Sequence, residues 1–342
     1  MSFQTIQEVG ADQLREGFRA SIQAQRASVG ASFKGSNNLT SSTVFFQDGV
    51  HFDLTYQPMK GLAQKAFTAA WSELLSKYAH AHHVSAVIAA PNHISVELVH
   101  QWVEGLNEAS TREQCILHTI DIQPASTAVS VALTLTGAIE ESNQPSNGTG
   151  PTTSGPKKGD LLCVTGELGA AFAGLRVLLR EKTIWQEATN AKLELEQTLQ
   201  PDLEPYQVVV AKQLAPMPNV AYAETLRTVL SSHSSLRFDH ALLKNGLHNE
   251  LQTLANRWDC GFEFYESALP ISLETRQVAD ELEEDVTRYA LLGGEDYEYL
   301  FTIPESETDV LSSFEGMCNV IGRVTAQEDG ILMHSANEES AS

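Results

Sequence analysis

The stretch DLLCVTGELGAAFAGL, residues 160–175, decides the fold class because it reads as a strand, a glycine turn and a helix in direct succession. DLLCVT is an apolar run of strand length. The glycines of TGELG, residues 165–169, allow the tight turn that follows. Apolar residues then recur with helical spacing at Leu168, Ala171, Phe172, Leu175, Leu178 and Leu179. A strand that leads directly into a helix indicates an α/β or α+β protein.

A linker precedes this stretch. Residues 140–158 read EESNQPSNGTGPTTSGPKK, and such a Ser-, Gly- and Pro-rich composition cannot bury apolar surface. We therefore expect an N-terminal domain at 1–139, a flexible linker at 140–158, a C-terminal α/β domain at 159–330 and a tail at 331–342. A chain of 342 residues is long enough for two domains of ordinary size.

Both parts alternate between strand and helix patterns. In the first part, VFFQDGVHFDL at 44–54 predicts a strand with an irregularity at Gly49, and AVSVALTLT at 128–136 alternates cleanly. Helices are predicted from Pro58 to about Tyr78 and through Val96, Val99, Val103 and Leu106. In the second part we expect a helix at 247–257 and strands at 262–266, at 297–303 and around Val320 and Ile321.

Composition excludes several classes of function. A net charge of −22 without any basic cluster argues against nucleic-acid binding, because phosphate backbones require Lys and Arg. No apolar run reaches 18 residues, and the N-terminus lacks the apolar core of a signal peptide, so we expect neither a membrane span nor secretion. The four cysteines form no C-x-x-C pair or disulfide spacing. These features favour a cytoplasmic protein.

Three short motifs are candidates for binding. The backbone N–H groups of TGELG are placed to bind an anion at a helix start, although such a turn needs glycine for geometry alone. HAHH at 80–83 offers histidines to a metal or, alternatively, a solvated helix end. In DGVHFD at 48–53, strand alternation would point Asp48 away from His51 and Asp53, so the three would form no local ligand set.

Three longer segments together resemble the thiamine-monophosphate kinase family, which is related to aminoimidazole ribonucleotide synthetase and selenophosphate synthetase. They are DGVHFDLTYQP, KKGDLLCVTGELGAAFAGL and GGEDYEYLFTIPES, and they occur in the family's order. The resemblance implies a homodimer whose N-terminal domains share a β-barrel, followed by an α/β domain. It also implies transfer of the γ-phosphate of ATP to thiamine monophosphate, with Mg²⁺ held by several aspartates.

The first part departs from the family at several of those aspartates. The family's GDDAAV segment corresponds to ASVGASFKGSNN, which contains no acid. Val44 stands where the family has another Asp, and Asp48 replaces the Glu of its EGVHF motif. The family's N-L-S-D is replaced by AWSE, so that Ala70 takes the place of Asn and Glu73 that of Asp. Spacing alone places the Asp of the family's GGDT motif at Asp121.

The second part departs from the family in one loop. Where the family carries D-x-S-D-G-L at the reaction centre, residues 242–247 read LLKNGL. Leu242 and Lys244 replace the first Asp and the Ser, and Asn245 replaces the second Asp. The family's phosphate-facing Arg is also lost, with Thr153 near that position. Lys244 is the one new group here that is able to neutralise a phosphate.

GGEDYEYLF, residues 293–301, keeps the family's pattern and admits two interpretations. Glu295, Asp296 and Tyr297 line a ligand pocket if the site works. Alternatively, Gly293 and Gly294 form a tight entry to a strand, the two acids accept hydrogen bonds from nearby backbone N–H groups in the turn, and the aromatic residues bury one face. We favour this structural interpretation.

These observations leave two functions open, beside a third, a different reaction in the same cleft, for which the sequence supplies no nucleophile–base pair. The first is a thiamine-monophosphate kinase-like enzyme with weak or lost catalysis, whose candidate residues are Asp48, His51, Lys244, Glu295, Asp296 and Tyr297 for ligands and Glu73 and Asp121 for a metal. The second is a non-catalytic relative that binds a small phosphorylated ligand or regulates other proteins. Both imply a homodimer, and in both the binding of Mg²⁺ and ATP is in doubt because of the lost aspartates.

Overall fold

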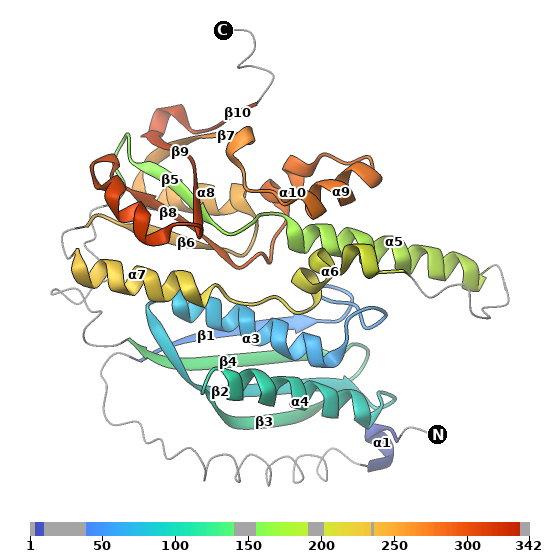
Figure 1. Ribbon diagram of the computed structural model, residues 1–342. Coiled ribbons are helices and arrows are strands. Elements are labelled where there is room, and N and C mark those ends of the chain that lie inside the picture. Colours follow the sequence, from blue (N-terminus) through green and yellow to red (C-terminus); the bar gives the residue numbers. More distant parts are fainter. Residues whose placement is uncertain (1–3, 10–38, 140–154, 191–201, 234–235, 336–342) are drawn as a thin grey trace. The chain divides into compact units, whose positions relative to one another are not determined.

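The structure, a computed structural model, describes residues 4–9, 39–139, 155–190, 202–233 and 236–335. The chain divides into two compact units, Met1–Glu140 and Glu141–Ser342, and each contains its own β-sheet (Figure 1). Both sheets are mixed, and helices pack against both, so the protein is of the α/β class. None of the helices in these described ranges is long and apolar enough to cross a membrane.

The first unit is a four-stranded sheet with two long helices. The strand order is β1-β4-β2-β3, in which β2 and β3 are parallel and the other neighbours antiparallel. The elements are α1 (Ile6–Val9), β1 (Leu39–Gln47), α3 (Met59–Leu75), β2 (Ala79–Pro91), α4 (Val96–Arg112), β3 (Ile116–Ala125) and β4 (Ser130–Ile139). The helices α3 and α4 pack against each other and against the sheet.

Alternation along the strands of the first unit determines which side chains the helices cover. Val131, Leu133 and Leu135 of β4 are buried, as is Val129 just before it, which confirms the alternation predicted at 128–136. On α4, the buried residues Val96, Val99, Trp102, Leu106 and Ala109 recur every three or four positions, as expected for a helix that covers a sheet.

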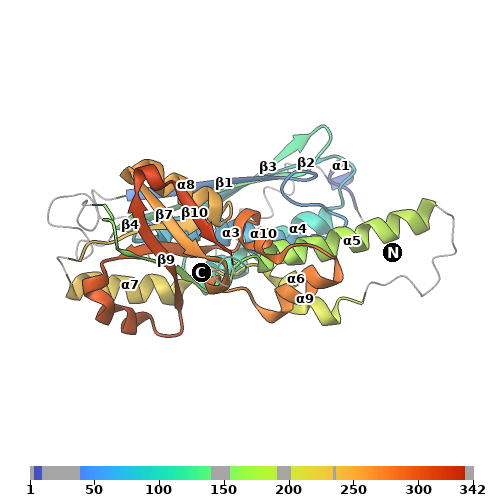
Figure 2. The same ribbon diagram turned by 90° about the horizontal axis from the view of Figure 1, so that it is seen from above.

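The second unit is built on a six-stranded sheet of order β10-β7-β9-β5-β8-β6. Its strands are β5 (Leu161–Thr165), β6 (Asp239–Leu243), β7 (Cys260–Tyr265), β8 (Glu298–Ile303), β9 (Cys318–Ala326) and β10 (Ile331–His334). Its helices are α5 (Ala170–Asn190), α6 (Gln207–Leu214), α7 (Val220–Ser232), α8 (Leu247–Trp258), α9 (Leu273–Glu281) and α10 (Val286–Leu292). Helix α5 is flanked by α6 and α9 in both views (Figures 1 and 2).

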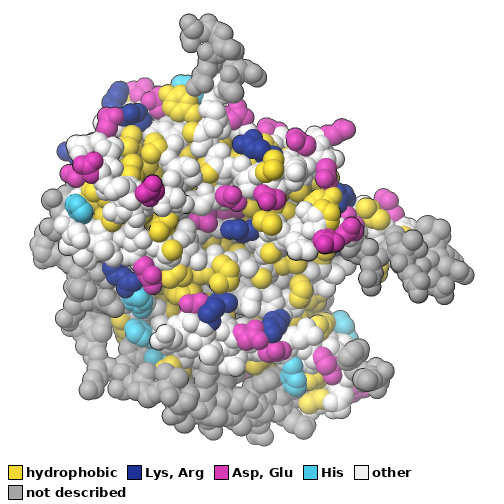
Figure 3. Space-filling view, viewed as in Figure 1, with side chains coloured by type: hydrophobic (Ala, Val, Ile, Leu, Met, Phe, Trp, Pro, Cys, Tyr) yellow, Lys and Arg dark blue, Asp and Glu magenta, His cyan; other side chains and the backbone are white. Residues whose placement is uncertain are grey.

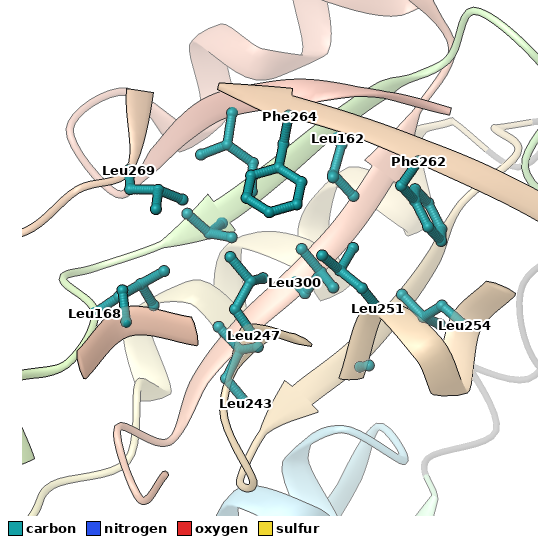
Figure 4. Packing of buried hydrophobic residues seen from close by; sticks show 14 of the residues in the cluster. Leu162, Leu168, Leu243, Leu247, Leu251, Leu254, Phe262, Phe264, Leu269 and Leu300 are labelled. Carbon is teal, nitrogen blue, oxygen red and sulfur yellow. The ribbon is translucent and has the colours of Figure 1, made fainter. Parts of the chain in front are cut away.

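Two apolar layers enclose the centre of this second sheet. On one side, Leu247, Leu251 and Leu254 of α8 face Leu300 and Phe262 of the sheet (Figure 4). Every residue of β5 and β8 is buried, because these strands lie in the interior of the sheet.

On the other side of β8, the ring of Tyr222 on α7 stacks on that of Tyr299, with 4.7 Å between the ring centroids. The pattern at 297–303 had predicted only one apolar face for this strand. The structure buries the opposite face as well, because Leu300 joins the cluster under α8.

The structure corrects four local predictions. The strand predicted at 44–54 ends at Gln47, and Gly49 lies in a turn with a φ of 79°. HAHH belongs to β2 rather than to a helix end. Pro58 is the N-cap residue that precedes α3 and does not belong to its first turn, and the helix ends at Leu75 instead of near Tyr78. Residues 331–334 of the predicted tail form β10, which pairs in parallel with β7.

Several elements were not predicted at all, among them β2, β3, β6 and α7. In β2, the sequence AHAHHVSAVIAAP is rich in Ala and His, which are not strong strand formers, so its alternation is weak. Its strand conformation is imposed by pairing with β4 on one side and β3 on the other.

Candidate functional site

The segment 293–298 lies alongside the end of β6 in the second unit. The backbone N–H of Glu295 donates to the carbonyl of Lys244 (2.9 Å), and that of Tyr297 donates to the carbonyl of Leu243 (3.2 Å). Glu295 and Tyr297 both have positive φ, 68° and 53°, a conformation that is uncommon for residues with a Cβ. The structure therefore brings this segment together with the rewritten loop 242–246.

The two glycines of the segment are needed for close packing rather than for a left-handed turn. A Cβ on Gly293 would lie 2.2 Å from the carbonyl oxygen of Tyr289, and one on Gly294 would lie 2.6 Å from that of Lys244. The φ of Gly293 is −66°, which any residue can adopt. The positive φ angles expected at these glycines occur instead at the next residues in the chain.

Asp296 is buried and bonded to the glycine turn before α5. Its carboxyl oxygens accept hydrogen bonds from the backbone N–H of Gly169 (2.9 Å) and of Ala171 (3.3 Å), and only 8% of the residue is exposed. Burial raises the pKa of this carboxyl to about 7, against the opposing effect of the two N–H donors. Two of the N–H groups at this helix start, which we considered as an anion site, are thus used by the protein's own carboxyl.

Glu298 forms a second buried network that sequence reasoning missed. Its Oε2 accepts from Thr165 Oγ1 (2.6 Å) and from Asn219 Nδ2 (2.7 Å), and Thr165 Oγ1 in turn accepts from the N–H of Tyr299 (2.8 Å). A Cβ on Gly166 would lie 2.3 Å from the Glu298 carboxylate, so this turn requires glycine. An acid within an aromatic run was the available sequence signal, because buried carboxylates need partners.

In the loop 242–246, Asn245 places an amide donor where the family has its second acid, and that amide is bonded within the chain. Asn245 Nδ2 donates to Glu250 Oε1 of α8 at 3.2 Å, and Asn245 is exposed. Burial raises the pKa of the Glu250 carboxyl, while hydrogen bonds from Asn245 and the charge of Lys244 act in the opposite direction. Gly246 begins α8 with a φ of 88°. Glu250 is therefore the acceptor that the sequence comparison did not identify.

Two of the ligand candidates in the first unit stabilise a turn. Asp48 Oδ1 accepts from the N–H of Leu54 (3.0 Å), and His51 Nδ1 accepts from the N–H of Gln47 (3.1 Å). The alternation argument for Asp48, His51 and Asp53 was wrong, because the residues after Gln47 form a turn and not a strand. Both side chains have local structural partners, so the geometry does not single them out as ligand-binding groups.

The two predicted metal ligands lie on different elements of the first unit. Glu73 of α3 accepts from Ser42 Oγ (3.0 Å) and pairs with Lys77 (3.4 Å). Asp121 of β3 accepts from the N–H of Ile122 and from Gln123 Nε2. Among the residues that the structure describes, no group of three or more His, Cys, Asp and Glu side chains is placed to hold a metal ion. Glu73 and Asp121 thus belong to no such group within the described ranges.

Two positions where the family has polar groups are part of the apolar core of the first unit. Val44 is 4% exposed, and Ala70 is fully buried. The family's upstream acidic segment corresponds to residues 27–38, and its arginine to Thr153, and both lie outside the described residues.

Comparison with known proteins finds relatives of the chain in sequence and in fold. No family model matches it. A thiamine-monophosphate kinase from Buchnera aphidicola subsp. Schizaphis graminum is 26% identical over 303 residues, which cover 86% of this chain and 82% of that protein. AaThiL complexed with AMPPCP and TMP has a TM-score of 0.69 at 21% identity, and the match covers 95% of this chain and 94% of that one.

The hydrogenase maturation protein HypE in complex with ATP has the same fold, with a TM-score of 0.63 at 14% identity over 90% of this chain and 84% of that one. The sequence relatives and the shared fold both agree with the resemblance carried by three segments of the chain, DGVHFDLTYQP, KKGDLLCVTGELGAAFAGL and GGEDYEYLFTIPES. The chain is therefore a divergent relative of thiamine-monophosphate kinases, and it shares its fold with them and with HypE.

Proposed function

We propose that the chain is a thiamine-monophosphate kinase-like protein in which phosphotransfer is weak or lost. The main support for this proposal is the set of replaced residues in the loop 242–246. Where the family has two acids, the chain has Leu242 and Asn245, and Asn245 is bonded to Glu250 of the same loop-helix junction. An amide cannot supply the negative charge that holds Mg²⁺ on a transferred phosphate.

Magnesium and ATP binding are expected to be weak for a second reason. Glu73 and Asp121 each accept hydrogen bonds from neighbouring groups and belong to no group of three or more possible ligands among the described residues, and Val44 and Ala70 are core residues. Each lost carboxylate removes charge stabilisation from the transition state, and about 1.4 kcal/mol corresponds to a tenfold change in rate. Several such losses together predict a rate lower by several powers of ten.

A phosphorylation assay with thiamine monophosphate and Mg-ATP tests this proposal. We expect no thiamine diphosphate above the background rate, and we expect calorimetry to detect no ATP binding that EDTA abolishes. The matched variant Leu242→Asp/Asn245→Asp returns both acids to the loop and should strengthen Mg-ATP binding. Turnover comparable to an active family member, or EDTA-sensitive micromolar ATP binding by the unmodified chain, would contradict the proposal.

The alternative is a non-catalytic relative that binds a small phosphorylated ligand or regulates another protein. The intact networks around Asp296 and Glu298 favour it, because they keep the structure beside the rewritten loop in order. Lys244 supplies a positive charge there in place of a metal ion. Calorimetry with thiamine monophosphate and thiamine diphosphate in EDTA distinguishes the two functions: binding without metal supports the alternative, and its absence argues against it.

A homodimer formed through the first sheet is part of the proposal. The face away from α3 and α4 carries small polar and apolar side chains, including Thr43 and Thr134, which are hydrogen-bonded to each other at 2.9 Å. Phe45 is 53% exposed, and Val87 is 38% exposed. Burial of such a face against a second copy, as in a shared β-barrel, would remove this apolar area from water.

Light scattering on the wild type and on Phe45→Lys tests the dimer. We expect a dimeric mass for the wild type and a shift toward monomer for the variant, whereas Leu273→Lys, at an exposed position of the second unit, should remain dimeric. A monomeric wild type at micromolar concentration would contradict the dimer. A cytoplasmic location also belongs to the proposal, and the four free cysteines are consistent with a reducing compartment.

A further inference from the structure

Two strands of the first unit each contain an irregularity at a histidine. The pairing of β2 with β4 shifts between Ala81 and His83, so that His82 is an extra residue on β2. The pairing of β2 with β3 shifts beside Val84, where Leu117 and Thr119 take successive partners and His118 is the extra residue on β3. Bulges of this kind change the direction of a side chain and recur next to functional sites.

The bulges bring two imidazole rings together across the strand pair. The ring centroids of His83 and His118 are 5.8 Å apart, and the ring planes are nearly perpendicular at 83°. His118 and His82 are exposed, and His83 is partly exposed. Figure 3 shows histidine side chains at several places on the surface of the first unit.

We propose that His83 and His118 form a two-histidine site for a borderline divalent cation such as Zn²⁺, Ni²⁺ or Cu²⁺. Imidazole nitrogens are preferred ligands of these ions and bind them at about 2.0–2.1 Å in the case of zinc. Two imidazoles that bind one tetrahedral ion hold their ring centres about 5 to 6 Å apart. The observed separation of 5.8 Å lies within that range.

The site differs in chemistry from the magnesium chemistry of the family. Mg²⁺ prefers carboxylate oxygen and water, and two imidazoles offer it little. Because no third His, Cys, Asp or Glu side chain of the described residues completes a cluster, water would fill the remaining positions on the ion. We therefore expect an exchangeable site of moderate affinity. This inference does not use the residues of the loop 242–246 on which the proposed loss of phosphotransfer rests, because it uses residues of β2 and β3 alone.

Calorimetry with Zn²⁺ and Ni²⁺ on the full chain, prepared without a polyhistidine tag, tests the site. We expect one binding event per chain with a dissociation constant in the micromolar range and a rise in melting temperature, and no response to Mg²⁺. His83→Gln and His118→Gln should each weaken binding by at least about tenfold, because each removes half of the protein ligands. The Cu²⁺-loaded protein should show coupling to two imidazole nitrogens in its electron paramagnetic resonance spectrum.

The control is His93→Gln, which removes an exposed histidine of the same unit from the turn before α4. It should bind Zn²⁺ like the wild type. Circular dichroism of each metal-free variant separates lost binding from lost folding, and His118→Gln at an exposed bulge should melt like the parent. Unchanged Zn²⁺ binding in the variant that lacks both histidines, or no binding to the folded wild type, would overturn the proposal.

Discussion

The segment 293–298 and the loop 242–246 lie side by side in the second unit, but only the first kept the residues of its family. Asp296 of the kept segment bonds to the turn before α5, and Glu298 bonds to Thr165 and Asn219. In the loop, Asn245 is exposed and bonds only to nearby residues, Asn249 and Glu250. The segment 293–298 therefore keeps the residues that form structural hydrogen bonds. The loop 242–246 has instead lost the acids that the family uses for a ligand.

The comparison also shows that a carboxylate at a candidate site has one of two roles, in catalysis or in the stability of the fold. A carboxylate that serves catalysis needs access to substrate, whereas Asp296 is 8% exposed with two backbone donors. A family motif that survives on such contacts does not demonstrate activity. The diagnostic positions are those where the family's acids have been replaced, and here they are Leu242 and Asn245.

The largest effect is expected at Gly246, a loop residue that packs against the kept segment. Gly246→Ala should destabilise the protein by about 2 to 4 kcal/mol, because its φ is 88° and the new Cβ would lie 2.7 Å from the carbonyl oxygens of Gly293 and Leu291. Denaturant unfolding measures the change. Gly49→Ala is the matched control, since its φ is 79° with no atom within 4 Å, and it should cost about 1 kcal/mol. Equal costs at the two glycines would show that the segments do not pack as described.

The next effect concerns Asp296. Asp296→Ala should lower the free energy of unfolding by about 1 to 3 kcal/mol, because the buried N–H groups of Gly169 and Ala171 lose their acceptor. Asp296→Asn keeps one acceptor oxygen and should cost less. If Asp296→Ala melts like the parent while it abolishes a measurable phosphorylation of thiamine monophosphate, the segment is catalytic and the comparison fails.

The same carboxyl should make stability depend on pH. Its pKa rises from an unfolded value of 3.8 to about 7 on folding, so the folded state holds the proton more tightly. Its contribution to stability is complete below the unfolded pKa and is lost as the pH rises through about 7. Between pH 6 and pH 8 this amounts to about 1 kcal/mol. Subtraction of the Asp296→Asn profile isolates it, and an identical pH profile for the two proteins would mean that Asp296 does not titrate in this range.

Strong periodicity made parts of the fold predictable. The alternation at Val129 to Leu135 identified β4, and the apolar stripes identified α4 and α5. The strand β2 gave no comparable signal, because it begins with AHAHH and owes its conformation to its neighbours. The turn at 48–52 was mistaken for a strand, since Asp48 and His51 stabilise it through local bonds that a residue pattern does not reveal.

The site was less predictable than the fold. Sequence reasoning expected Asp296 to accept hydrogen bonds from nearby backbone N–H groups of its own turn, whereas its donors, Gly169 and Ala171, are more than a hundred residues away. Glu298 was overlooked because its partners, Thr165 and Asn219, come from separate parts of the chain. Glu250 could have been identified from the sequence, because an acid in the first turn of a predicted helix is a recognised capping signal.

The smallest effect is expected for Asn245, and it is the most direct test of the comparison. Asn245→Ala removes one hydrogen bond of 3.2 Å to Glu250 at an exposed position, so the free energy of unfolding should change by no more than about 0.5 kcal/mol. Thermal and denaturant unfolding of this variant and Asp296→Ala, measured side by side, give the difference between the two segments. A loss at Asn245 equal to that at Asp296 would mean that the loop, like its neighbour, is held by its structural contacts. The replacement of the family's acids would then reflect a different way to build this turn, and not a release from catalysis.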